Sequence, residues 1–210
     1  MYLNLFYPKK SVQSCIDRPN IRIAFLVVLV PVIVSLIGWA WLGLPMDAMR
    51  IGISVVGAIL TWLILSIVFF VVLYLVRGNR MQGKFKSVAS SLSLLWLVFL
   101  VLLIIGFVFV SLVFSAPILN EAKLLVTGQS SLEEYSLAVG KIIDANPQAI
   151  SLEIGAIGVL IVALLILFSF YLAYLMVRDF YEGGFIKNFI VTIILLVLWM
   201  YIGNWLFVLL

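Results

Sequence analysis

Five apolar runs without a single charged residue decide what this chain can fold into. They are 22 to 28 residues long and cover residues 23–44, 51–76, 88–115, 154–177 and 188–210. About 20 apolar residues in a helix cross the hydrocarbon core of a bilayer. Only 10% of the 210 residues are charged, so water is a poor solvent for most of this chain. We therefore predict an all-α polytopic membrane helical bundle, with five transmembrane helices in one membrane domain over residues 1–210.

The segment before the first run is predicted to form a short helix from Pro8. Val12, Cys15 and Ile16 would then share one face, and Lys9 would lie at its polar start. We interpret this segment as an interfacial N-terminal helix lying on the membrane. The alternative is a short tail that only precedes the first span.

The outer loop, residues 116–151, is the one sizeable polar segment between the runs. Ser131 and Glu134 fit a capping box, in which each side chain bonds the backbone of the other residue. Apolar residues at helical spacing follow, so an extracytoplasmic amphipathic helix is predicted over residues 132–144. The acidic residues at its start suit the positive end of a helix dipole better than they suit cation binding or acid–base catalysis.

Basic residues are distributed unevenly between the two sides of the predicted membrane. With the N-terminus inside, the inner segments hold ten Lys and Arg residues and the outer segments hold three. Lys and Arg are enriched in cytoplasmic segments near span ends. The N-terminus is therefore predicted to be cytoplasmic and the C-terminus extracytoplasmic, in the cell membrane.

The stretch from 74 to 86, YLVRGNRMQGKFK, is the most basic turn between two runs and contains no acidic residue. Each cation contributes about 1 kcal/mol near an anionic membrane surface. We therefore single out Arg77, Arg80, Lys84, Phe85 and Lys86 as candidates for binding anionic lipid headgroups or a partner protein. The alternative is that these charges only set the orientation of the chain.

A loose repeat of this turn follows about a hundred residues later, at 174–187, YLMVRDFYEGGFIK. Both copies have a Tyr-Leu pair, then an arginine, then a glycine six residues after the arginine, Gly83 and Gly184. Spans two and three would pair as spans four and five do, as parallel repeats. Two turns with similar physical needs would explain the likeness equally well.

No residue pattern in the chain indicates catalysis, a cofactor or a metal. Histidine is absent, there is one cysteine, and no acid or base lies within a run. Intramembrane catalysts and ion paths need such groups at depth. Three functions remain: a scaffold that organises lipids or partner proteins, a transporter or channel for a neutral or hydrophobic solute, or an accessory subunit of a larger membrane complex. Hydroxyls that would line a transport path are Thr61, Ser66, Ser111 and Ser169.

The order of features resembles the Yip family of Ypt/Rab-interacting membrane proteins in its short prokaryotic form. The segments that carry the resemblance are FYPKKSV and RPN before the first run, YLVRGNRMQGKFKSVAS, and YLMVRDFYEGGFIKNFIV. The resemblance implies five spans, a cytoplasmic N-terminus and a role in membrane organisation or trafficking.

The resemblance also bears on partners. We expect anionic lipids on the cytoplasmic side, further copies of this chain or other membrane proteins, and no nucleic acid. Eukaryotic members have a longer, partly acidic N-terminal region that is tied to small-GTPase association. Here about 20 residues precede the first run, with Asp17 as their only acid, so small-GTPase binding is in doubt.

Overall fold

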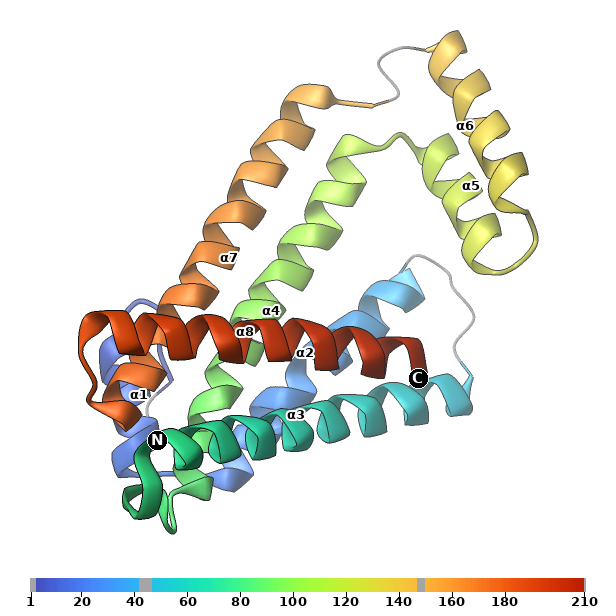
Figure 1. The fold of residues 1–210 in the computed structure, drawn as a ribbon. Helices are drawn as coiled ribbons and strands as arrows, with labels where there is room; N and C mark the ends of the chain where they lie inside the picture. Colours follow the sequence, from blue (N-terminus) through green and yellow to red (C-terminus); the bar gives the residue numbers. More distant parts are fainter. Residues whose placement is uncertain (1–2, 42–46, 147–149, 210) are drawn as a thin grey trace.

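Long helices make up nearly all of the structure, a computed structural model that describes residues 3–41, 47–146 and 150–209 (Figure 1). No strand occurs within these ranges; Phe114 and Ile150 form one isolated antiparallel bridge. The elements are α1 (Pro8–Asp17), α2 (Ile21–Trp41), α3 (Ala48–Arg77), the 3₁₀ helix η1 (Gly78–Met81), α4 (Phe85–Val113), α5 (Ala116–Val126), α6 (Leu132–Ala145), α7 (Leu152–Tyr181) and α8 (Phe185–Leu209).

Four helical segments of the described chain are long and apolar enough to cross a membrane. They are Ile21–Trp41, Ile51–Met81, Phe85–Val113 and Leu152–Tyr181. The all-α prediction is therefore confirmed, and the chain is a multi-pass membrane protein by the length and composition of its helices. A further apolar stretch, Phe185–Tyr201, is shorter. The predicted ends of the first and fifth spans, residues 42–44 and 210, lie outside the described residues.

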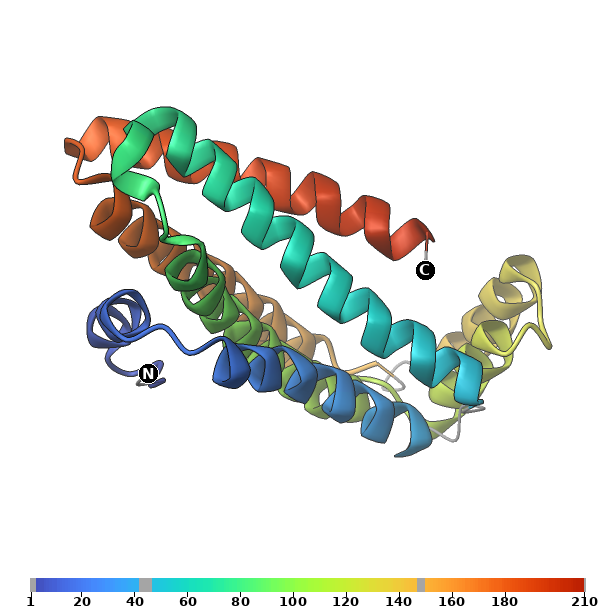
Figure 2. The same cartoon turned by 90° about the horizontal axis from the view of Figure 1, so that it is seen from below.

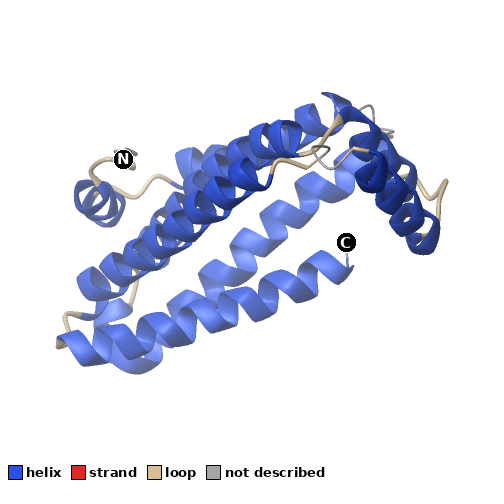
Figure 3. Ribbon diagram, turned by 90° about the horizontal axis from the view of Figure 1, so that it is seen from above, coloured by secondary structure: helices blue, strands red, loops and turns tan. Residues whose placement is uncertain are grey.

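The long helices form two layers (Figures 2 and 3), and in the view of Figure 1 the helices of one layer cross those of the other at an angle. Helices α2, α4 and α7 lie side by side in one layer, with α4 in the middle; α3 and α8 pair in the other. Two glycines allow close packing in the first layer. Gly38 of α2 meets the ring of Phe107, and Gly158 of α7 meets the ring of Phe109. The buried Trp62 of α3 joins the layers, because its indole N–H donates to the carbonyl of Ala89 at 3.1 Å.

The core of the bundle lies at one end. We call it the turn end, because the first turn, residues 74–86, and the second turn, residues 174–187, both lie there (Figure 2). In α4 the ten residues 87–96 are all buried, whereas Val108 and Leu112, nearer the other end, are 51% and 56% exposed. Lipid tails are as apolar as leucine, so such exposure is suited to a hydrocarbon solvent.

Helix α1 packs on α4 and α7 at the turn end. Val12 and Cys15 are fully buried, and the Ser87 hydroxyl of α4 donates to the carbonyl of Ile16 at 3.1 Å. The predicted apolar face exists, but it contacts protein, and its position at a membrane surface stays a prediction. Burial raises the pKa of the Cys15 thiol from 9.0 to about 12, because the thiolate would lose its hydration there.

Within the segment predicted to be the outer loop, α5 and α6 form a helical hairpin at the end opposite the turn end (Figure 1). The predicted capping box is present: the Ser131 N–H donates to the Glu134 carboxylate at 2.7 Å, and the Glu134 N–H donates to the Ser131 hydroxyl at 3.2 Å. These hydrogen bonds hold the pKa of Glu134 below its usual value. Helix α5 was not predicted from the sequence, and the predicted fourth span ends at residue 177, whereas α7 continues through Arg178 and Asp179 to Tyr181.

Candidate functional site at the turn end

The turn end carries most of the positive charge of the described chain. Helix α1, both turns and the first residues of α2, α4 and α8 meet there (Figure 2). Three acidic residues, Asp17, Asp179 and Glu182, lie in the same segments. The exposed basic residues are Lys9, Lys10, Arg18, Arg22, Arg80, Lys86 and Lys187. An uneven charge of this kind attracts anions over a screening length of about 8 Å at physiological ionic strength.

Two glycines shape the first turn. Gly78 and Gly83 have φ angles of +67° and +76°, which residues with a Cβ rarely adopt. Between them, η1 places the fully buried Met81 in the core. The turn is thus anchored by one apolar side chain, while its basic residues lie around that anchor.

The five predicted binding residues differ in their exposure. Arg80 and Lys86 are exposed, and Lys84 is half-buried. Phe85 is also half-buried, and its ring packs edge-on against Phe70 with the centroids 5.7 Å apart. The cations that remain accessible to a headgroup or a partner are therefore Arg80, Lys84 and Lys86.

Arg77 is the exception among the basic residues of the first turn. Its side chain is only 10% exposed, and its Nη2 lies 2.8 Å from Oε2 of Glu182 in the second turn. Within the described residues, its Nε and Nη1 atoms are buried without a hydrogen-bond partner. A buried guanidinium needs a counter-charge, because burial removes its hydration. The ion pair therefore links the α3–α4 hairpin to the α7–α8 hairpin.

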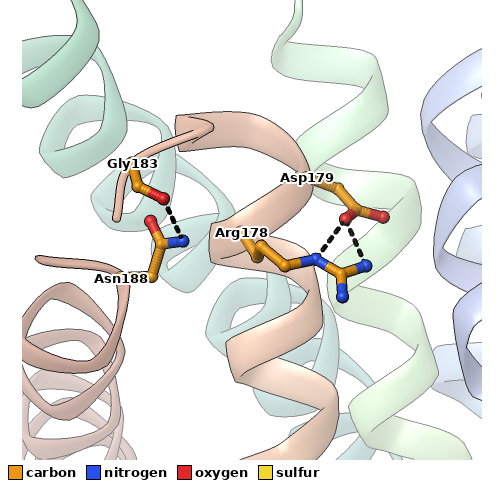
Figure 4. A network of polar contacts seen from close by, with 4 residues as sticks. All are labelled: Arg178, Asp179, Gly183 and Asn188. Atoms are coloured by element: carbon orange, nitrogen blue, oxygen red, sulfur yellow. Dashed lines mark hydrogen bonds and ion pairs between the residues drawn. The ribbon is translucent and has the colours of Figure 1, made fainter. Parts of the chain in front are cut away.

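The second turn is organised by polar contacts (Figure 4). The Arg178 guanidinium donates to one oxygen of Asp179 through Nε at 2.9 Å and Nη2 at 2.7 Å. The buried Asn188 amide donates to the carbonyl of Gly183 at 2.9 Å. Glu182 ends α7 with a φ of 54°, a left-handed angle that favours glycine. Neither Glu182 nor Asn188 was predicted from the sequence as a site residue; the one signal for Glu182 was an acid directly before two glycines.

Four buried serines line the first half of α4. The Ser93 hydroxyl donates to the carbonyl of Ser90 at 2.7 Å, while the hydroxyls of Ser90 and Ser91 have no partner among the described residues. Small side chains let α1, α2, α3 and α7 approach α4 closely, as in other membrane bundles. Close packing is therefore the role that the contacts of this segment support.

The hydroxyls expected to line a transport path are bonded within their own helices. Each of these hydroxyls donates to a backbone carbonyl oxygen four residues earlier, at 2.7–2.9 Å: Thr61 to Gly57, Ser66 to Trp62, Ser111 to Phe107 and Ser169 to Leu165. Such bonds satisfy a hydroxyl without a solute or a neighbouring helix. Across residues 3–41, 47–146 and 150–209, no three His, Cys, Asp or Glu residues lie close enough to hold a metal ion.

Comparisons with models of known families, with curated proteins and with solved structures found no match for this chain. The turn end is thus characterised by its own geometry: an excess of cations around the ion pair between the largely buried Arg77 and the exposed Glu182. Its chemistry is that of an anion-attracting surface.

Proposed function

We propose that this chain is a non-enzymatic, Yip-type membrane protein, a scaffold that organises anionic lipids or partner proteins at its turn end. The proposal is carried by the exposed cations Arg80, Lys84 and Lys86 on a turn held in place by the buried Met81. Ten basic and three acidic residues in the segments of this end give it a strong positive field. The family resemblance supports the proposal through the order of the runs and turns.

The proposed topology has five spans, with α8 as the fifth, the turn end in the cytoplasm and the α5–α6 hairpin outside. Helix α8 has 25 residues, about 38 Å at 1.5 Å per residue, which exceeds a hydrocarbon core of about 30 Å. Single cysteines in place of the exposed Gln82 and Glu133 test this arrangement with a membrane-impermeant maleimide on intact cells. We expect the maleimide to label the Glu133→Cys variant and not the Gln82→Cys variant. Labelling of both from the same side would refute the topology.

Replacing the three accessible cations tests the lipid role. The variant Arg80→Gln/Lys84→Gln/Lys86→Gln removes three charges, each contributing about 1 kcal/mol near an anionic surface. We expect its apparent affinity for phosphatidylglycerol in mild-detergent micelles to fall by up to about a hundredfold, with a weaker salt dependence. The matched control is Lys123→Gln/Lys141→Gln in the outer hairpin, which should bind as the parent does. Equal binding by both variants would remove the lipid role.

The main alternative is a transporter or channel for a neutral or hydrophobic solute. The internal hydrogen bonds of Thr61, Ser66, Ser111 and Ser169 leave these hydroxyls without a need for a solute. Solute flux in proteoliposomes that the triple Gln variant leaves unchanged would favour transport over the scaffold. A membrane protein that copurifies in fixed proportion would favour the accessory subunit.

A further inference from the structure

An apolar groove lies on the surface between α2 and α3, close to the turn end. It has a volume of about 380 Å³ and is lined by Ile21, Arg22, Phe25, Leu26 and Trp62. Small-molecule sites in proteins have volumes of about 300–1,000 Å³. The buried Trp62 forms part of its floor. The rings of Phe25 and Trp62 pack edge-on, with their centroids 6.5 Å apart. The groove is therefore large enough for part of a ligand, and its floor is fixed by a hydrogen bond to α4.

The lining of the groove is apolar throughout, because Arg22 lines it with the aliphatic part of its side chain and not with its guanidinium. Arg22 is the only charged residue among its lining residues, and it lies in the first turn of α2. Phe25 and Leu26 lie one turn deeper in the same helix, in the direction of the hydrocarbon core. A molecule that fits must therefore place an apolar chain beside an anionic group, in this order along the helix.

The start of α2 adds to the attraction for an anion. Asn20 caps the helix, because its side-chain oxygen accepts from the N–H groups of Arg22 and Ile23 at 3.1 Å. The aligned peptide dipoles still leave a partial positive charge at this end. Arg22 and the helix dipole thus favour the same kind of group, and an arginine fork matches the geometry of a phosphate.

We propose that the α2–α3 groove binds one anionic phospholipid of the surrounding bilayer. Its phosphate pairs with Arg22 at the start of α2, and its acyl chain lies over Phe25, Leu26 and Trp62. The site rests on the membrane placement of α2 and α3 given above, but it is separate from the basic turn, because Arg80, Lys84 and Lys86 do not line it. The groove would thus be a specific lipid site on a face of the bundle for which the sequence predicts no role.

A phosphatidylglycerol with a photoactivatable diazirine in its acyl chain tests this site in nanodiscs of neutral phosphatidylcholine. Cross-links mapped by mass spectrometry are expected on residues 21–26 and on Trp62. Arg22→Gln should reduce them about tenfold, because the phosphate loses its charge-assisted hydrogen bonds. Lys187→Gln is the matched control: it also removes one exposed cation of the turn end that does not line the groove, and it should leave these cross-links unchanged.

The outcomes separate this site from the general lipid role of the turn end. Cross-links that are equally frequent with a diazirine phosphatidylcholine would refute the proposal, since the groove would then take any acyl chain. An equal loss of cross-links in Arg22→Gln and Lys187→Gln would also refute it, since only the overall positive field of the turn end would then matter. If the triple Gln variant of the basic turn loses its phosphatidylglycerol preference while residues 21–26 never cross-link, the proposed function stands and the groove site fails.

Discussion

The ion pair between Arg77 and Glu182 is the contact of this structure whose removal has the most predictable consequence. The Glu182 side chain is 66% exposed, so the attraction itself is screened by water. Exposed pairs contribute about 0–1 kcal/mol. The Arg77 side chain, however, is 10% exposed. Removing its partner leaves a guanidinium without compensation at a cost of about 1–3 kcal/mol. We therefore expect Glu182→Ala to lower the free energy of unfolding by about 1–3 kcal/mol.

A double-mutant cycle isolates this effect. Arg77→Met keeps an apolar stem of similar length and removes the charge, so it should cost less than Glu182→Ala. In the Arg77→Met background, Glu182→Ala has no buried charge to leave unpaired and should have an effect close to zero. The measurement is reversible unfolding by SDS in mixed micelles, followed by circular dichroism. A coupling energy of about 1–3 kcal/mol is expected; additivity within about 0.5 kcal/mol would refute the reasoning.

The backbone of Glu182 supplies the control. A left-handed φ of 54° costs a residue with a Cβ about 1 kcal/mol, whether that residue is Glu or Ala. Glu182→Gly loses the same ion pair but removes this backbone cost. It should therefore be about 1 kcal/mol more stable than Glu182→Ala. If the two variants are equally stable, the turn does not hold the strain that its angle indicates.

Two further predictions concern packing and thiol reactivity. Gly158→Ala should lower the free energy of unfolding in SDS by about 1–3 kcal/mol, because its Cβ would lie 2.8 Å from the Phe109 ring. Gly155→Ala is the control: its Cβ would lie 3.9 Å from Val113, so the same measurement should show no change. Cys15 should react with a maleimide at pH 8 about a thousandfold more slowly in the folded protein than in SDS, because a pKa of about 12 leaves little thiolate. The reaction rate of the folded protein should keep rising with pH well beyond pH 9. Comparable rates in both states would show that α1 is not packed on α4.

The long helices were predictable because charge-free runs of this length have few alternatives. The residues at which these helices end were harder to predict. Arg178 and Asp179 interrupt the apolar pattern, yet α7 continues through them, since the two side chains pair with each other and stay partly in contact with solvent. Sequence reasoning that ends a span at its first charge will place such an end too early. The capping box was readable because its two side chains are three residues apart, within a single helical turn.

The candidate site was only half visible in the sequence. Arg77, Arg80 and Lys84 cannot be told apart as binding candidates from the sequence, because they lie in one basic stretch. Arg77 differs in being paired with Glu182, which lies about a hundred residues away in the sequence. No local pattern predicts which cation such an acid will meet. The groove was hidden for the same reason, because Arg22 and Trp62 come from different helices and become neighbours only when α2 packs against α3.

The two turns share an aromatic contact as well as a similar sequence. In both, an aromatic side chain of the helix that ends there meets one of the helix that follows: Phe70 with Phe85 at 5.7 Å, and Tyr174 with Phe185 at 5.9 Å. The order of contacts, α3 to α4, α4 to α7, α7 to α8 and α8 to α3, is the one that two parallel hairpins would have around a shared axis. Either a duplication or a common need to close a tight helical hairpin yields such pairs.

The charges of the two turns are not alike, and this difference matters for function. The first turn has basic residues only, whereas the second has Asp179 and Glu182 beside Arg178 and Lys187. Asp179 pairs with Arg178 within the second turn, and Glu182 pairs with Arg77 of the first. The contact between Glu182 and Arg77 links the two hairpins, whereas the contact between Asp179 and Arg178 stays within α7. The first turn is thereby left with Arg80, Lys84 and Lys86 for an anionic surface, and lipid preference should depend on this turn far more than on Lys187.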